Sequence, residues 1–249
     1  MATAALTPEL ASMEMFRTSL IRESGSKETA ERLCAVGRFT SLSRGAMLWQ
    51  NPDADRLVYI ASGAVKLIGQ RSGPLGLEPL AASRTPTGSQ ILAFHFAGEI
   101  VSVLHHSERD VRLAALCDTD LVIFWTDQFL DVAEGDPAVI RAMLTRSLEA
   151  LQRSRARMMQ LGHKSARQRV ADFLVTLAQR IGVPDGAACD LTLPMSRRDI
   201  ADSLGLTLET VSRQFADLRT EGLVATSGRS AVRLPDMAAL AREAGQRTS

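Results

Sequence analysis

The chain has 249 residues, 45% hydrophobic and 23% charged, a balance typical of a folded globular protein and not of a disordered one. A formal net charge of +1 excludes a general attraction to nucleic acid or to membranes, so any such attraction needs a local basic patch. No apolar run approaches the roughly 18 residues of a membrane span, and the N-terminus has no secretory-signal pattern. We therefore expect a cytoplasmic protein without a membrane partner.

The first 129 residues contain two different patterns. Residues 1–35 look helical, and we expect them to be loosely attached. From Arg38 to Phe129 the sequence consists of short apolar or alternating runs punctuated by Gly, Pro, Asn and Asp, which predicts an antiparallel β-domain. Gly63 lies at a predicted turn between two strands, and Gln70–Ser89 is predicted to be a long loop.

A helical period begins at Asp136–Pro137 and continues for about 25 residues. It produces one narrow apolar stripe, composed of Ile140, Leu144, Leu148, Leu151, Met158 and Leu161. Such a stripe predicts a long helix that packs against the same helix of a second subunit, and the alternative is packing on its own β-domain. The remaining surface is predicted to be solvated and carries Arg141, Arg146, Arg153, Arg155 and Arg157.

The helical pattern resumes over His163–Gly182, with a hinge expected near Leu161–Ser165, until "VPDGAACDLTLP" interrupts it. The stretch Met195–Phe215, "MSRRDIADSLGLTLETVSRQF", then contains two short helical patterns separated by Gly205. Ser196 and Asp199 have the spacing of a capping box at the start of the first helix. Gly205 can adopt the left-handed conformation that ends this helix, and Thr207 can cap the second one.

The second helix has two faces of different chemistry. Leu208, Val211, Phe215 and Leu218 fall on the side expected to pack inward, and Glu209, Ser212 and Arg213 fall opposite. Arginine can donate two hydrogen bonds to guanine, glutamate can accept one from cytosine, and serine can serve either role. This pattern predicts a helix that reads bases in a major groove. The alternative is a helical hairpin whose polar side merely contacts water.

The segment "GLVATSGRSAVRLPD" shows two short β patterns around residues 227–230, which predict a wing beside this helix. Phosphate contacts position a protein on DNA without reading its sequence. The residues expected to make them are Ser196, Arg197, Arg198, Thr207, Thr210 and Arg229, with Arg233 as a further candidate.

The segment "LPMSRRDIADSLGLTLETVSRQFADLRTEGLV" resembles the helix-turn-helix of the CRP/FNR transcription regulators, specifically the FNR/FixK branch. "SGAVKL" and "ILAFHFAGE" resemble the β-roll of that family, so the resemblance covers about residues 38–240. It implies an α+β fold with an N-terminal antiparallel β-roll of the jelly-roll or cyclic-nucleotide-binding kind, a long dimerisation helix and a C-terminal winged helix-turn-helix. The expected divisions are 1–35 for the helical segment, 36–135 for the β-roll, 136–162 for the dimerisation helix and 163–249 for the DNA-binding domain.

The resemblance also implies a function. We expect a homodimer that binds double-stranded DNA at a TTGAT-N4-ATCAA-like palindrome, with Glu209, Ser212 and Arg213 as the base-reading set. Members of the family usually activate promoters by contacting RNA polymerase. They often control responses to low oxygen or redox change.

The sequence departs from the sensing members of the family. The iron–sulfur sensor uses four cysteines, whereas Cys34, Cys117 and Cys189 are dispersed, so we expect neither a cluster nor a disulfide framework. Cyclic-nucleotide binders use a glutamate and, ten residues later, an Arg–Ser pair. Glu99 and Arg109 match this spacing, but Asp110 follows Arg109, which predicts at most a degenerate effector pocket.

The four histidines are expected to be surface residues, because their spacing does not favour a metal site. We therefore expect no cofactor, no metal and no catalytic residues. Two alternatives stay open: a regulator gated by haem or a small molecule, and a cupin-type metalloenzyme. The second lacks its His-x-His pair, because Ala97 follows His95 at the required position.

Overall fold

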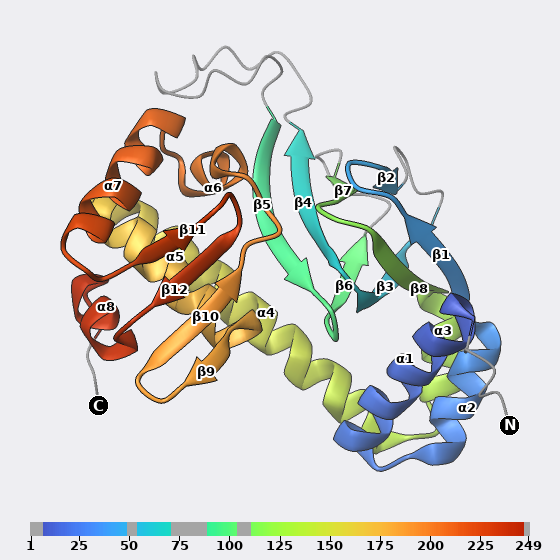
Figure 1. Ribbon diagram of the computed structural model, residues 1–249. Coiled ribbons are helices and arrows are strands. Elements are labelled where there is room, and N and C mark those ends of the chain that lie inside the picture. The colour runs from blue at the N-terminus through green and yellow to red at the C-terminus, as the bar shows by residue number, and fades with distance from the viewer. Residues whose placement is uncertain (1–6, 49–53, 71–88, 104–110, 247–249) are drawn as a thin grey trace, which may run out of the picture. The chain divides into compact units, whose positions relative to one another are not determined.

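The computed structural model describes residues 7–48, 54–70, 89–103 and 111–246. The chain divides into two compact units, one formed by residues 1–74 and 91–153 and the other by residues 75–90 and 154–249. Each unit is described by itself below, with the element labels of Figure 1. In the part of the chain that the structure describes, no helix is long and apolar enough to span a bilayer.

The first unit contains two four-stranded sheets, with the strand orders β1-β8-β3-β6 and β2-β7-β4-β5. The described registers are antiparallel, as predicted. The first sheet comprises β1 (Arg38–Leu42), β8 (Thr119–Trp125), β3 (Arg56–Ser62) and β6 (Ile100–Val103). The second comprises β2 (Met47–Leu48), β7 (Val111–Ala115), β4 (Ala64–Gln70) and β5 (Ser89–Phe96).

Alternating side chains from both sheets form one apolar core. Val58 and Ile60 lie opposite Ile123 and Leu121 in the β3–β8 pair, and all four are buried. The predicted turn at Gly63 is confirmed, with φ at +82°. A Cβ atom there would lie 2.5 Å from the carbonyl oxygen of Asp118, so both the conformation and the space require glycine.

Three helices, α1 (Pro8–Ser24), α2 (Lys27–Val36) and α3 (Thr126–Ala133), form a second core beside the first sheet (Figure 1). Phe16 of α1 is 1% exposed and packs edge-to-face against Tyr59, with ring centroids 5.3 Å apart. It also contacts Phe124. The expectation of a loosely attached N-terminal segment is therefore wrong, because α1 and α2 supply core residues such as Phe16 and Leu33.

The long helix α4 (Pro137–His163) begins as its sequence predicts. The Asp136 side chain accepts hydrogen bonds from the backbone N–H groups of Ala138 and Val139, and proline occupies the first helical position. Val139 is fully buried and Met143 packs partly against the second core, so this side of the helix faces its own unit.

The second unit contains α5 (Ala166–Ile181), α6 (Arg197–Leu204), α7 (Leu208–Thr220) and α8 (Met237–Glu243). Its sheet has the order β11-β12-β10-β9. The strands are β9 (Val183–Asp185), β10 (Ala188–Thr192), β11 (Ala225–Ser227) and β12 (Ala231–Leu234). The interruption expected at "VPDGAACDLTLP" therefore holds two strands, and the wing hairpin is one half of a four-stranded sheet.

Candidate nucleic-acid interface

The helix caps predicted for the helix-turn-helix are present in the structure. Ser196 Oγ accepts a hydrogen bond from the backbone N–H of Asp199 at 3.1 Å, and the Asp199 carboxylate accepts one from the N–H of Ser196 at 2.9 Å. Gly205 ends α6 with φ at +62°. Thr207 Oγ1 accepts from the N–H of Thr210 at 3.0 Å and caps α7. Each such cap stabilises its helix by about 0.5–2 kcal/mol.

One face of α7 packs inward. This face carries the buried side chains of Val211, Phe215 and Leu218, and α6 contributes the buried side chains of Ile200 and Leu204. The expectation that Leu208 joins this face is wrong, because its side chain is 42% exposed. Periodicity gives the direction of a side chain, but it does not say whether another element covers the first turn of a helix.

The opposite face of α7 is exposed. Glu209, Ser212 and Arg213 all lie there within the first two turns, at the i, i+3 and i+4 positions that share one side of a helix. The N-terminal half of such a helix is the part that reaches base edges in helix-turn-helix complexes. The arrangement therefore presents an acceptor, a hydroxyl and a bidentate donor together to solvent.

Some of the residues expected to contact phosphates are exposed, and others already have contacts within the protein. Arg198 is exposed, and Arg229 is exposed at the tip of the β11–β12 hairpin. Arg197 instead lies over the ring of Phe215, with its guanidinium carbon 3.5 Å from the ring centroid, and burial lowers its pKa. The hydroxyls of Ser196 and Thr207 serve as helix caps, and Thr210 Oγ1 lies 2.8 Å from Thr207 Oγ1.

Arg233, a further candidate for phosphate contact, has two carboxylate partners within its own sheet. It donates to Asp190 Oδ2 at 2.6 Å and to Asp185 Oδ2 at 2.7 Å, and these bonds raise its pKa. Its guanidinium therefore connects β12 to β9 and β10. A phosphate contact by Arg233 would compete with both ion pairs.

Two arginines of α5, neither singled out by the sequence, hold the ends of the helix-turn-helix. Arg167 donates to both carboxylate oxygens of Glu221, the residue that follows α7, and to Glu243 of α8. These bonds raise the pKa of Arg167. Arg169 donates to the carbonyl oxygen of Leu204 at 3.0 Å, at the end of α6. Their partners lie 35 to 76 residues away, and no local motif reveals such pairs.

The predicted dimer stripe is exposed wherever its side chains are described. The exposed fractions are 37% for Ile140, 58% for Leu144, 51% for Leu148 and 45% for Leu151. Met158 and Leu161 belong to α4, but their side chains lie outside the described residues. Arg146 was expected on a solvated face, and this is wrong: its side chain is 22% exposed and bonds to other elements of its unit.

The possible effector residues are only partly described. Glu99 follows the β5–β6 turn, and its Oε2 lies 3.0 Å from His95 Nδ1, so His95 is not a free surface histidine. A pocket of about 640 Å³ adjoins this turn and is lined by residues that include Glu99, Arg141 and Arg146. Arg109 lies outside the described residues.

Cys34 and Cys117 are partly buried free cysteines, and Cys189 is a buried one. Burial raises the pKa of the thiols of Cys34 and Cys189. Cys117 lies between β7 and β8. Among the described residues, no group of three metal-ligating side chains comes together.

The second unit is a winged helix-turn-helix whose second helix exposes a polar face, and a long helix connects it in sequence to a two-sheet unit. This combination defines a DNA-binding transcription regulator. Similarity to known proteins supports this class. The family model of the Crp-like helix-turn-helix domain matches residues 168–243.

Two curated relatives and one solved structure extend the match to both units. The nitrogen fixation regulation protein FixK of Azorhizobium caulinodans is 41% identical over 226 residues, covering 87% of this chain and 83% of that protein. FixK of Bradyrhizobium diazoefficiens is 34% identical over 211 residues, covering 84% and 83%. The structure of FixK2 from Bradyrhizobium japonicum superposes with a TM-score of 0.69 at 27% identity, covering 86% and 99%.

The chain therefore belongs to the CRP/FNR family of transcription regulators, in its FixK branch. Members of this family are regulators and not enzymes, so the cupin-type metalloenzyme alternative is wrong.

Proposed function

We propose that the protein is a cytoplasmic homodimeric regulator that binds a TTGAT-N4-ATCAA-like palindrome and activates transcription through RNA polymerase. Each copy places α7 in a major groove, about one DNA turn from its partner. The observation that carries the proposal is the joint exposure of Glu209, Ser212 and Arg213 on one face of α7. The family resemblance supports the activator role and a response to low oxygen or redox change.

The three side chains have complementary chemistry for bases. Arg213 donates its two N–H groups to O6 and N7 of a guanine, and Glu209 accepts from N4 of a cytosine. Ser212 either donates or accepts. Leu208, which the sequence pattern placed inside, is exposed beside Glu209 and offers an apolar surface to a thymine methyl group.

Phosphate contacts hold this helix in its groove. Arg198 and Arg229 are the exposed cations near the start of α6 and at the wing tip. Ser196 and Thr207 mark the starts of α6 and α7, where backbone N–H groups attract anions. These contacts give salt-dependent affinity that does not depend on sequence.

The second copy covers the stripe of Ile140, Leu144, Leu148 and Leu151. Four exposed leucine and isoleucine side chains on one face of a helix are costly in water, and their mutual burial favours association. A symmetric dimer would also match the two-fold symmetry of a palindromic site.

A second candidate is the same regulator gated by a small molecule or haem. The pocket of about 640 Å³ beside Glu99 favours it, because its size suits a small ligand and the exposed Arg141 supplies a cation. In this alternative the ligand changes dimerisation or DNA affinity.

One experiment separates the candidates. A gel shift of aerobically purified protein on the TTGAT-N4-ATCAA duplex is combined with an ultraviolet–visible spectrum of the same sample. Tight binding by a colourless protein is the expected result for the ungated regulator. A Soret band, or binding that appears only after a ligand is added, would favour gating, and the absence of any preference over random DNA would contradict both.

A further inference from the structure

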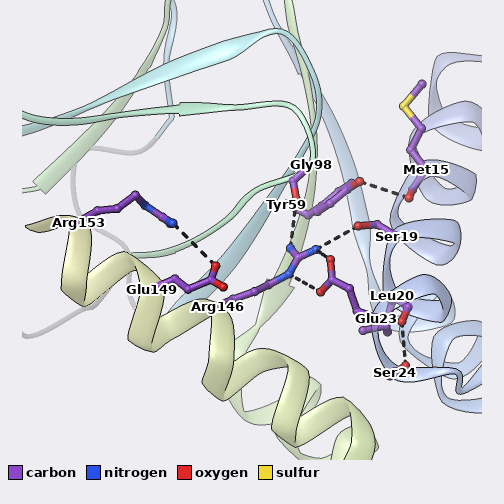
Figure 2. A network of polar contacts seen from close by, with 10 residues as sticks. All are labelled: Met15, Ser19, Leu20, Glu23, Ser24, Tyr59, Gly98, Arg146, Glu149 and Arg153. Carbon is purple, nitrogen blue, oxygen red and sulfur yellow. Dashed lines mark hydrogen bonds and ion pairs between the residues drawn. The ribbon is translucent and has the colours of Figure 1, made fainter. Parts of the chain in front are cut away.

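Arg146 occupies an unusual position on α4. Its guanidinium donates to the Glu23 carboxylate through Nε, at 2.5 Å from Oε2, and through Nη2 to Oε1. It also donates to Ser19 Oγ and to the carbonyl oxygen of Gly98, both at 3.1 Å (Figure 2). One side chain therefore joins three segments of its unit: α4, α1 and the β5–β6 turn.

The partners of Arg146 are themselves fixed. Phe16 and Leu20 bury α1 in the second core, and the Tyr59 hydroxyl donates to the carbonyl oxygen of Met15 at 3.2 Å (Figure 2). Glu23 and Ser19 therefore project from a helix that is already anchored. The planar guanidinium matches the carboxylate with two parallel bonds, which restricts direction as well as distance.

Arg146 is also the last inward contact of the described part of α4. Val139 and Met143 precede it on the same side, at the i, i+4 and i+7 positions. Every residue from Ser147 to Arg155 is exposed. Within residues 137–155, Arg146 is therefore the last residue that packs against the rest of the first unit.

The apolar stripe lies on the other side of the helix. Leu144 and Leu148 are two positions before and after Arg146, and two residues correspond to about 200° of rotation around a helix. A bond network that pulls Arg146 inward consequently turns Leu144 and Leu148 outward. Without these hydrogen bonds, the first unit would no longer hold α4 beyond Met143 in one orientation.

We propose that Arg146 is a positioning residue for dimer formation: it fastens α4 to α1 and the β5–β6 turn, and so holds the apolar stripe in the orientation that a second copy requires. This inference rests on the proposed homodimer. It also assigns a role to the N-terminal helices, which brace the dimerisation helix through Glu23 and Ser19.

A charge exchange in the full-length protein tests the inference by analytical ultracentrifugation. Arg146→Glu alone places two carboxylates together and is expected to raise the dimer dissociation constant by at least about tenfold, as is Glu23→Arg alone. The double exchange, Arg146→Glu with Glu23→Arg, is expected to recover part of the wild-type affinity, because it restores the ion pair but not the hydrogen bond to the carbonyl oxygen of Gly98. Recovery would show that the effect depends on the pairing of the two opposite charges and not on the loss of either side chain by itself.

Arg153→Ala is the matched control. Arg153 lies seven residues further along the same side of α4, but it is 46% exposed and pairs with Glu149 of its own helix (Figure 2). It is expected to leave dimerisation nearly unchanged. Arg146→Lys keeps the positive charge but cannot make two parallel hydrogen bonds to the carboxylate. Its dimer dissociation constant should therefore lie between those of the wild type and Arg146→Glu, and this test remains if the charge-reversed variants fold poorly.

The outcomes are distinguishable. A wild-type protein that stays monomeric at every concentration would overturn the proposed homodimer itself. Two results would overturn the role of Arg146 and leave the homodimer intact: a dimer dissociation constant that is the same in Arg146→Lys as in the wild type, or a double exchange that recovers none of the affinity lost in the single variants.

Discussion

The helices α4 and α7 are packed in a similar way, but their exposed sides differ in polarity. Each has an inward side held within its own unit, by Val139 and Met143 in α4 and by Val211 and Phe215 in α7. Each leaves the other side exposed. The exposed side is apolar on α4, where Leu144 is 58% exposed, and polar on α7.

This difference suggests an order of assembly. An exposed apolar stripe is unfavourable in water at every moment, so its partner should be present before DNA is met. A hydrated polar face has no such cost and gains free energy only when DNA replaces water. Damage to α4 should therefore remove dimerisation and DNA binding together, whereas damage to α7 should remove DNA recognition alone.

The largest effect is expected from Leu148→Asp. A carboxylate in the middle of the stripe would have to be buried in the dimer, so association should be lost. Binding to the palindrome should weaken by more than about 100-fold, because the two half-sites are then bound independently. Sedimentation and fluorescence anisotropy measure the two losses. Arg153→Asp places a carboxylate on the opposite side of the helix, about 140° of rotation from Leu148, and should retain the dimer.

A smaller, selective effect is expected from Arg213→Ala. Loss of a bidentate guanine contact should weaken binding to the palindrome by about 1–3 kcal/mol and leave the dimer and random-DNA affinity nearly unchanged. Arg219→Ala removes an exposed arginine from the last turn of the same helix and is the control. Equal losses on palindrome and random DNA would count against base reading.

Arg167→Ala should act on the second unit alone. It removes the ion pairs with Glu221 and Glu243, which are partly exposed, so we expect a stability loss of roughly 1 kcal/mol. Denaturant unfolding with probes in each unit measures the change. A loss that appears equally in the β-roll would contradict the local role of Arg167.

The smallest effect concerns acid stability of the first unit. Hydrogen bonds from the hydroxyls of Ser26 and Thr29, together with the helix N–H groups, lower the pKa of Asp136 to about 2. Because the folded value is depressed, the stabilisation is present above the ordinary pKa near 4 and is lost as the pH falls from about 4 towards 2. Asp136 lies near the surface, so solvent screening limits this contribution to the free energy of unfolding to less than about 1 kcal/mol.

Unfolding free energies measured across that pH range should show a shallower slope in Asp136→Asn than in the wild type. Asparagine retains a capping oxygen but has no proton to gain, so it isolates the titration from the cap. The same slope in both proteins would show that other carboxylates dominate.

The predictable parts of the molecule are those encoded locally. The caps at Ser196 and Thr207 and the turns at Gly63 and Gly205 depend on residues within a few positions, so the sequence was sufficient for them. The face of α7 that carries Glu209, Ser212 and Arg213 follows from helical periodicity in the same way.

The remaining features depend on distant partners. Arg146 looked like one of several solvated arginines, because its acceptor Glu23 lies 123 residues earlier in the chain. The firm packing of α1 depends on Tyr59 and Phe124, which no local pattern connects to Phe16. Periodicity likewise placed Leu208 inside, where only the arrangement of neighbouring elements shows that it is exposed.

The most direct test combines one protein change with one base change. Anisotropy titrations at fixed salt compare the wild type and Arg213→Ala on the TTGAT-N4-ATCAA duplex and on a duplex whose half-site guanine is replaced. We predict that the wild type loses about 1–3 kcal/mol on base replacement and that Arg213→Ala loses almost nothing further. An Arg213→Ala protein that still distinguishes the guanine as strongly as the wild type would contradict base reading by α7.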